Sequence, residues 1–208
     1  MIYNYIKRLV DVALSALLTI SLAPLWILVT LAIKFTSPGP VLFRQVRGGR
    51  GGRPFDSFKF RTMRADHRHD ATEIVPLTHH AITPVGRILR RLKIDELPQL
   101  LNVLKGDMSL VGPRPTIMDQ VLAYSDVQKR RLEVRPGITG LAQVNGNANI
   151  SWDERIKYDV YYVDHVSFSL DLFILLKTLA VIVRGESRFS RPFEQSPYGT
   201  GLRIEGSG

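Results

Sequence analysis

The longest apolar stretch of the chain lies near its N-terminus, where the 22 residues 12–33 carry no charged side chain. A helix of this length extends for about 33 Å, which is enough to cross the hydrocarbon core of a bilayer. A cleavable signal peptide is the alternative, but its apolar part is shorter and ends at a small-residue cleavage site. We therefore predict a membrane helix over residues 1–36.

A proline interrupts this apolar stretch near its middle. Pro24 removes a backbone hydrogen bond and clashes with the preceding helical turn, so we expect a kink there. Basic residues flank both ends of the stretch: Lys7, Arg8, Lys34, Arg44, Arg47, Arg50 and Arg53. Because basic flanks prefer the cytoplasmic side, a helix that is broken at Pro24 and returns to the same leaflet suits both ends. An ordinary kinked span is the alternative.

The pattern after this segment is typical of a β-hairpin. A Ser-Pro-Gly-Pro sequence ends the membrane segment, and residues 41–60 then contain two short apolar runs around a glycine-rich turn. In the second run Phe58 and Phe60 alternate with Lys59 and Arg61, which places the aromatic rings on one face and the cations on the other. The cations either hold a phosphate or belong to a solvated strand face.

Helical periodicity begins after Thr83. This residue suits an N-cap, Pro84 suits the first helical position, and apolar residues then recur at helical spacing. The other face of this short helix is strongly basic, with Arg87, Arg90, Arg91 and Lys93. The pattern therefore predicts a short cationic helix immediately before the motif that begins at Asp95.

A second helix is predicted to begin at Asp95. Four leucines follow at helical spacing, and Lys105-Gly106 supplies a cation and a stop. Pro98 then falls in the first turn, where proline is tolerated. This interpretation places Asp95 at or near the N-cap, with Glu96 beside it.

Two further helices are predicted at residues 152–160 and 169–183. The second helix is apolar but too short to be a typical membrane span, so we expect it to pack on the domain or to lie in the membrane interface. The expected fold class is α+β, a mainly helical membrane-associated domain with a small β-hairpin. We divide it into a membrane helix at 1–36, a domain at 37–184 and a tail at 185–208. The last residues, 204–208, are interpreted as an expression remnant.

Composition and charge narrow the function. The chain has 208 residues and a formal net charge of +9, which indicates one sizeable domain with an anionic partner such as nucleic acid, a lipid surface or a phosphorylated substrate. No cysteine is present, which excludes disulfides and thiolate chemistry. No Gly-x-x-x-x-Gly-Lys-Ser/Thr sequence occurs, which argues against a P-loop kinase or ATPase.

A cluster of histidines and acidic residues is a candidate metal site. Its members are His67, His69, His79, His80, Asp66 and Asp70. Since no helix or tight turn in the pattern gathers these ligands, we favour a surface loop without a metal.

Asp95 and Glu96 are the candidate catalytic pair. Carboxylates at a helix start are common for structural reasons, because they cap the helix and interact with its dipole. Here basic residues precede the pair and a Gly-Pro-Arg-Pro sequence follows it, so we expect the dipole and the cations to keep Asp95 ionised. An ionised carboxylate can act as a nucleophile toward phosphorus, and Glu96 is suited to hold Mg²⁺.

Residues 95–115, DELPQLLNVLKGDMSLVGPRP, resemble the core motif of the bacterial sugar transferases, the monotopic polyprenyl-phosphate phosphoglycosyl transferases. Residues 58–63, 85–87, 135–140 and 142–146 support the resemblance, which covers nearly the whole chain. The resemblance implies that Asp95 attacks the β-phosphate of a UDP-sugar, releases UMP and holds the sugar phosphate covalently until a polyprenyl phosphate takes it.

The resemblance also implies roles for further residues. Mg²⁺ would lie on Glu96. Phosphate-binding cations would be Lys59, Arg61, Arg90, Arg114 and Arg135, with a weaker expectation of nucleotide or sugar binding for Asp107, Gln143 and Asn145. The family's small members have a re-entrant helix broken before a proline, which favours re-entry at Ala23-Pro24.

These implications set the expected partners and location. The partners are a UDP-sugar donor, a polyprenyl phosphate acceptor and membrane lipid, with a homodimer left open and no nucleic acid. The expected location is the cytoplasmic face of a bacterial inner membrane, at the start of glycoconjugate assembly. A non-enzymatic basic protein that binds anionic lipid or nucleic acid is the alternative.

The chain departs from the family pattern at two positions. Lys93 stands where serine is usual, two residues before Asp95, and Asn147 stands where arginine often follows Asn145-Gly146. Either change could alter how the donor is held. Larger relatives carry extra transmembrane helices ahead of this region, and nothing precedes Met1 here, so a minimal form is expected.

Overall fold

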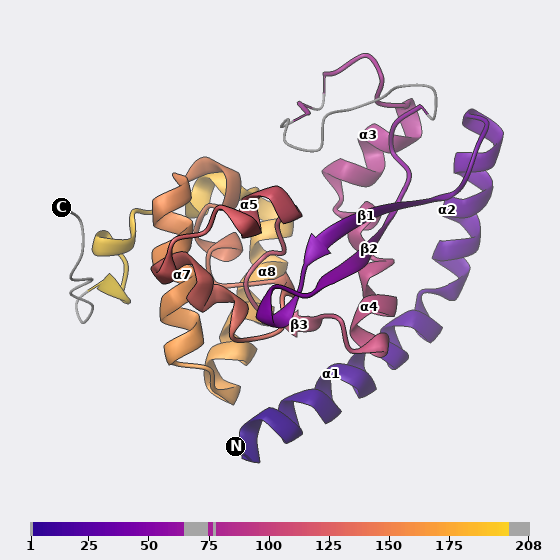
Figure 1. Ribbon diagram of the computed structural model, residues 1–208. Coiled ribbons are helices and arrows are strands. Elements are labelled where there is room, and N and C mark those ends of the chain that lie inside the picture. Colours follow the sequence, from indigo (N-terminus) through magenta and orange to yellow (C-terminus); the bar gives the residue numbers. More distant parts are fainter. Residues whose placement is uncertain (1, 65–74, 77, 200–208) are drawn as a thin grey trace.

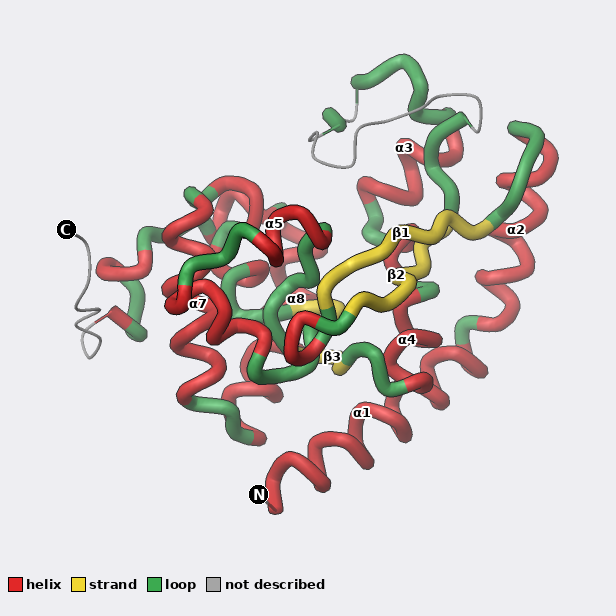
Figure 2. The backbone as a smooth tube through the Cα atoms, in the orientation of Figure 1, coloured by secondary structure: helices red, strands yellow, loops and turns green. Residues whose placement is uncertain are grey.

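The computed structural model describes residues 2–64, 75–76 and 78–199. Two N-terminal helices run along one side of the molecule, a β-hairpin crosses its middle, and the helices of the C-terminal half gather on the other side (Figure 1). Helices predominate over the short strands, as the tube view makes plain (Figure 2). The mainly helical α+β prediction is confirmed.

The N-terminal segment is a bent pair of helices. Helix α1 (Ile2–Ser21) and helix α2 (Ala23–Thr36) meet at 60°, and Pro24 lies in the first turn of α2. Proline has no N–H to bond the preceding turn, which explains why the break falls beside the expected kink. Within the described residues no single helix is long and apolar enough to cross a membrane, whereas this bent pair meets both criteria together.

Charged residues of α1 bind helix α4 (Gln99–Lys105) and strand β3 (Ser109–Val111). The guanidinium of Arg8 donates to the carbonyls of Val103 and Leu104 at 2.6 and 3.1 Å. The hydroxyl of Ser109 donates to the carboxylate of Asp11 at 2.7 Å, so this carboxylate is buried and partnered. One face of the start of α1 is therefore fixed against α4 and β3.

The predicted hairpin is confirmed. Strand β1 (Leu42–Gly48) pairs antiparallel with β2 (Pro54–Phe60), and the turn contains the 3₁₀ element η1 (Arg50–Gly52). Gly51 and Gly52 have φ values of 67° and 74°, a left-handed conformation that favours glycine. The hairpin presents Lys59 at its end, opposite Phe43.

The helix after Thr83 is confirmed, but the predicted start of the next helix at Asp95 is wrong. Helix α3 (Pro84–Arg91) is capped by the Thr83 hydroxyl, which accepts from the Gly86 N–H at 2.9 Å. Asp95 then lies in a 3₁₀ turn, η2 (Ile94–Glu96), and helix α4 (Gln99–Lys105) begins only after Pro98. Pro98 has no N–H with which to continue an α-helical ladder, so the preceding turn closes with i→i+3 bonds instead.

The remaining strands and helices belong to the C-terminal half of the chain. Strand β3 (Ser109–Val111) pairs parallel with β4 (Gly137–Thr139). The helices are α5 (Met118–Leu122), α6 (Asp126–Lys129), α7 (Trp152–Asp164) and α8 (Phe168–Arg184), with 3₁₀ elements η3 (Arg130–Leu132), η4 (Gln143–Asn145), η5 (Asn147–Asn149), η6 (Glu186–Phe189) and η7 (Phe193–Gln195). The two long helices confirm those predicted at 152–160 and 169–183.

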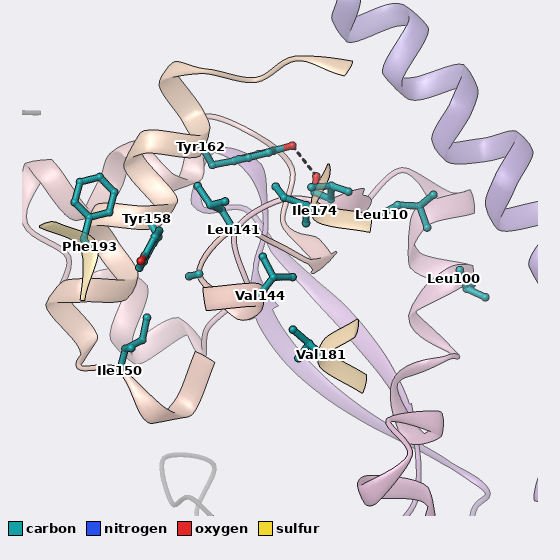
Figure 3. Packing of buried hydrophobic residues seen from close by; sticks show 12 residues of the cluster. Leu100, Leu110, Leu141, Val144, Ile150, Tyr158, Tyr162, Ile174, Val181 and Phe193 are labelled. Atoms are coloured by element: carbon teal, nitrogen blue, oxygen red, sulfur yellow. Dashed lines mark hydrogen bonds between the residues drawn. The ribbon is translucent and has the colours of Figure 1, made fainter. Parts of the chain in front are cut away.

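The main core lies between these elements (Figure 3). Tyr158, Tyr162 and Ile174 are completely buried in it, and Phe193 brings the C-terminal segment onto α7. The hydroxyl of Tyr162 lies 3.1 Å from the carbonyl of Val111, so even the polar end of this large side chain is satisfied. Ile94 and Leu97, which flank Asp95 and Glu96, pack against a second, smaller cluster of Val29, Ile33, Phe60 and Leu89.

Several expectations fall on residues outside the described part of the chain. These are the histidine-rich loop, with Asp66, His67, His69 and Asp70, and the remnant at 204–208. His79 and His80 are described, and their rings stack at a centroid distance of 4.4 Å. No group of three or more potential metal-ligating side chains is found among the described residues.

Candidate active site

Asp95 and Glu96 lie in the η2 turn, between the basic helix α3 and helix α4. The turn follows Lys93, whose backbone is left-handed with φ of 58°, and it packs against β2. Asp95 is only 8% exposed. The local sequence thus holds both carboxylates in a tight, half-enclosed turn rather than at a helix N-cap.

Two cations clamp Glu96. The Lys59 ammonium donates to Oε1 at 2.7 Å, and the Arg114 guanidinium donates to Oε1 at 2.6 Å and to Oε2 at 3.2 Å. Burial by itself would raise the pKa of Glu96, but the charges and hydrogen bonds of Arg114 and Lys59 hold this pKa well below its usual range. Glu96 is therefore a permanently ionised carboxylate at neutral pH.

The environment of Asp95 differs from the expected one. Burial and, next, the neighbouring charge of Glu96 raise the pKa of Asp95, against the opposing effects of Lys59, Arg90 and Lys93. The helix-dipole part of the expectation is wrong, because Asp95 precedes α4 by a full 3₁₀ turn. A raised pKa makes the carboxylate more basic and hence a better nucleophile once it is ionised.

The five predicted phosphate-binding cations separate into two groups. Lys59 and Arg114 contact Glu96, and Arg90, whose Nε donates to the Thr62 hydroxyl at 2.9 Å, is close enough to influence the pKa of Asp95. Arg61 and Arg135 are engaged elsewhere. Arg61 is buried and donates to Ser37 and Pro38 after α2, and the Arg135 Nε donates to the Gly106 carbonyl at 3.0 Å.

The three residues with weaker expectations are also dispersed. Asp107 forms an ion pair with Lys105 at 3.3 Å beyond the end of α4. Asn145 is buried, and its Oδ1 accepts from Lys177 at 2.7 Å. Gln143, whose amide donates to the Ile138 carbonyl at 2.8 Å, lines a cavity beside Arg114.

This cavity, of about 250 Å³, is rich in arginine. Four arginines from different segments line it: Arg47, Arg114, Arg131 and Arg155. Trp152 and Asn147 contribute to the wall. Arg131 and Arg155 were not predicted as site residues, and Arg47 was predicted only as a membrane flank, because no local pattern links these distant segments.

The cavity arginines differ in how their charges are balanced. Arg131 is buried and pairs with the buried Asp159 at 2.6 Å. Burial and the charge of Arg114 lower the pKa of Arg47 to about 10, and burial, Arg114 and Arg131 lower that of Arg155. Neither Arg47 nor Arg155 forms an ion pair within the described residues. An anionic ligand would relieve this charge imbalance.

Comparison with known proteins gives a consistent result. The family model described as bacterial sugar transferase matches residues 2–185. An uncharacterized sugar transferase, EpsL, of Bacillus subtilis is 46% identical over 98% of this chain and 97% of its own length. The UDP-glucose:undecaprenyl-phosphate glucose-1-phosphate transferase of Caulobacter vibrioides is 45% identical, over 88% of this chain and 72% of its own. The UDP-N-acetylgalactosamine-undecaprenyl-phosphate N-acetylgalactosaminephosphotransferase of Aeromonas hydrophila is 44% identical, over 88% of this chain and 45% of its own length.

Proposed function

Because the chain belongs to the bacterial sugar transferase family, we propose that this sugar-phosphate transferase moves a sugar 1-phosphate from a UDP-sugar to undecaprenyl phosphate and releases UMP. The observation that carries the proposal is the buried Asp95 beside a Glu96 that is clamped by Lys59 and Arg114. A non-enzymatic basic surface protein does not account for this pair or for the similarity to transferases.

In the proposed first step, a carboxylate oxygen of Asp95 attacks the β-phosphorus of the UDP-sugar. A bond forms between Asp95 and phosphorus, and the bond from phosphorus to the bridging oxygen breaks, so that UMP leaves with the electron pair. In the second step a phosphate oxygen of the polyprenyl phosphate attacks the same phosphorus. The acyl phosphate bond then breaks, which regenerates Asp95 and yields the polyprenyl-diphosphate-sugar.

The cationic groups around the pair support the electrostatic part of this proposal. Lys59, Arg90 and Arg114 offer donors for phosphate oxygens whose charge changes during transfer. The donor set also fits Mg²⁺, since Glu96 is an ionised, hard oxygen ligand, and Mg²⁺ typically uses one or two carboxylates together with substrate phosphates. When bound to Glu96, the metal would neutralise phosphate oxygens.

The arginine-rich cavity is the proposed place for the nucleotide end of the donor. Arg114 contacts Glu96 and also lines the cavity, so a nucleotide there would extend from the acidic pair. Arg47 and Arg155 then meet the α-phosphate and gain the anionic partner that they lack within the described residues.

Replacing Arg155 with methionine is expected to raise the KM for the UDP-sugar by about 10-fold to 100-fold, because a charge-assisted hydrogen bond is lost. Inhibition by added UMP should weaken in parallel, whereas the KM for undecaprenyl phosphate should stay unchanged. Steady-state kinetics with each substrate varied in turn measures all three. Arg53→Met, at an exposed arginine of the hairpin turn, is the matched control. A rise in the acceptor KM alone would contradict this assignment.

The activity itself is tested by incubating the purified protein with a panel of UDP-sugars, Mg²⁺ and undecaprenyl phosphate and measuring UMP. At least one UDP-sugar should give UMP and a polyprenyl-diphosphate-sugar. Release of UDP in place of UMP would identify transfer of the sugar without its phosphate and would contradict the proposed reaction.

We also propose a re-entrant membrane attachment on the cytoplasmic face of the bacterial inner membrane. Exposed apolar side chains line the bent pair, including Leu17, Ile20, Ile27, Leu28 and Leu31. The contacts from Arg8 and Asp11 to α4 and β3 keep the start of α1 on the same side as the catalytic turn. Helix α8 adds an exposed apolar face with Leu172, Leu176, Leu179 and Val183.

Single cysteines provide a topology test, because the natural chain has no cysteine. Tyr5→Cys near the N-terminus and Asp126→Cys in α6 should both react with a membrane-impermeant maleimide only after cells are permeabilised. Both positions are exposed in the structure, so the protein surface does not block either reaction. Labelling of the Tyr5→Cys variant in intact cells, with Asp126→Cys protected, would indicate an ordinary span and contradict re-entry.

A further inference from the structure

Glu186 connects the acidic turn with the cavity wall. It lies in η6, directly after helix α8, and its Oε1 takes part in one ion pair and accepts one side-chain hydrogen bond. The Lys93 ammonium lies at 2.8 Å and the Asn147 amide at 3.1 Å. Lys93 leads into the turn that holds Asp95, whereas Asn147 lines the cavity. One carboxylate oxygen therefore joins two segments that are more than fifty residues apart in the chain.

The backbone at both partners has a left-handed conformation. Lys93 and Asn147, with φ of 58° and 45°, are the two non-glycine residues with positive φ among the described residues. This conformation is costly for lysine and easier for asparagine, and non-glycine residues that adopt it cluster at functional sites. The side chains of Lys93 and Asn147 both contact Glu186.

Glu186 also lies within the electrostatic field of the cavity. The pKa of Arg114 is raised mainly by Glu96, and the charge of Glu186 adds to this effect, whereas burial opposes it. The charge of Glu186 also opposes the lowering of the Arg155 pKa by burial. Its side chain is 22% exposed, so the surrounding solvent screens these interactions only in part. The carboxylate is thus close enough to both cavity arginines to affect their charge balance.

We propose that Glu186 is a positioning residue for the first transfer step, which holds the Asp95 turn in register with the donor cavity through its ion pair with Lys93 and the hydrogen bond that it accepts from Asn147. The inference rests on the proposed function, because it assumes that Asp95 attacks a donor bound in the cavity. The family model ends at residue 185, so this role belongs to a residue directly beyond the matched region.

The effect should fall on the rate of the first step rather than on binding. Without Glu186, Lys93 is free to leave its left-handed conformation, and the turn that follows shifts relative to the cavity. A misplacement of about 1 Å in a reacting group can lower the rate by about 100-fold. The cavity arginines remain, so donor binding should change little.

The test uses the full-length protein in lipid nanodiscs, with a UDP-sugar that the wild type accepts. Glu186→Ala should lower the single-turnover rate of UMP release by about 10-fold to 100-fold, with the donor KM changed by less than about threefold. Glu186→Gln keeps an acceptor oxygen for Asn147 but loses the charge that pairs with Lys93, and it should recover part of the rate. Lys93→Ala should slow the same step, and the double variant with Glu186→Ala should be no slower than the slower single variant.

A second acidic residue of the same segment provides the control. Glu194 forms an ion pair with Lys157 on α7, and Glu194→Ala should keep the wild-type rate. Equal single-turnover rates for wild type and Glu186→Ala would overturn the inference. So would equal losses in the Ala and Gln variants with a lower thermal midpoint and higher KM for both substrates, which would indicate a general structural role. If the wild type itself releases no UMP from any UDP-sugar, the proposed function fails instead.

Discussion

Asp95→Asn is expected to reduce UMP release from a UDP-sugar by about 1,000-fold or more, because the amide retains the shape of the carboxylate but cannot form an acyl phosphate. Asp95 is buried, so the isosteric change should leave the fold intact. A coupled assay for UMP measures the loss. Thermal unfolding of the variant should match that of the wild type within a few degrees.

The covalent step has its own signature. Wild-type protein that is mixed with the UDP-sugar and Mg²⁺, without undecaprenyl phosphate, should gain the mass of the sugar phosphate on the peptide that contains Asp95, and Asp95→Asn should gain none. Asp126→Asn is the matched control, since this carboxylate is exposed and forms an ion pair with Lys129 on the surface of α6. An adduct on another residue, or full UMP release by Asp95→Asn, would show that Asp95 is not the nucleophile.

Local patterns predicted much of the scaffold around this residue. The alternation after the glycine-rich turn predicted the hairpin that presents Lys59, and Thr83-Pro84 predicted the start of α3. These features depend on neighbouring residues, so the sequence suffices to identify them. The predicted start of α4 at Asp95 was wrong because Pro98 was expected to be tolerated in the first turn of the helix. Since Pro98 has no N–H, η2 ends before it and α4 begins after it.

The site beyond the acidic pair depends on contacts that no local pattern contains. The cavity gathers Arg47 from the hairpin, Arg131 from η3 and Arg155 from α7. Arg61 alternates with the phenylalanines as expected, yet its guanidinium binds the loop after α2. A basic residue in a motif therefore has no assigned partner until the tertiary structure is known. The two departures from the family pattern give another example, because Lys93 and Asn147 are far apart in the sequence but both contact Glu186 in the structure.

Glu96→Gln is expected to lower UMP release by about 100-fold or more and to remove the response to Mg²⁺. The glutamine amide has no charge with which to hold a hard cation. Loss of the glutamate charge also leaves Lys59 and Arg114 without their shared counter-charge. Titration of UMP release with Mg²⁺, and with a chelator, measures the response. Wild type should lose activity with the chelator and regain it with Mg²⁺, whereas the variant should stay near its low rate in both.

A lower activity of Glu96→Gln could also arise from the two unbalanced cations, and a second variant separates this cause from loss of the metal ligand. Lys59→Met combined with Glu96→Gln removes one positive charge together with the negative one, so the partly buried charges are again closer to balance. The thermal midpoint should therefore rise above that of Glu96→Gln, while UMP release and the Mg²⁺ response should stay low. Recovery of activity in this double variant would mean that Glu96 serves to neutralise Lys59, and the assignment of Mg²⁺ to Glu96 would be wrong.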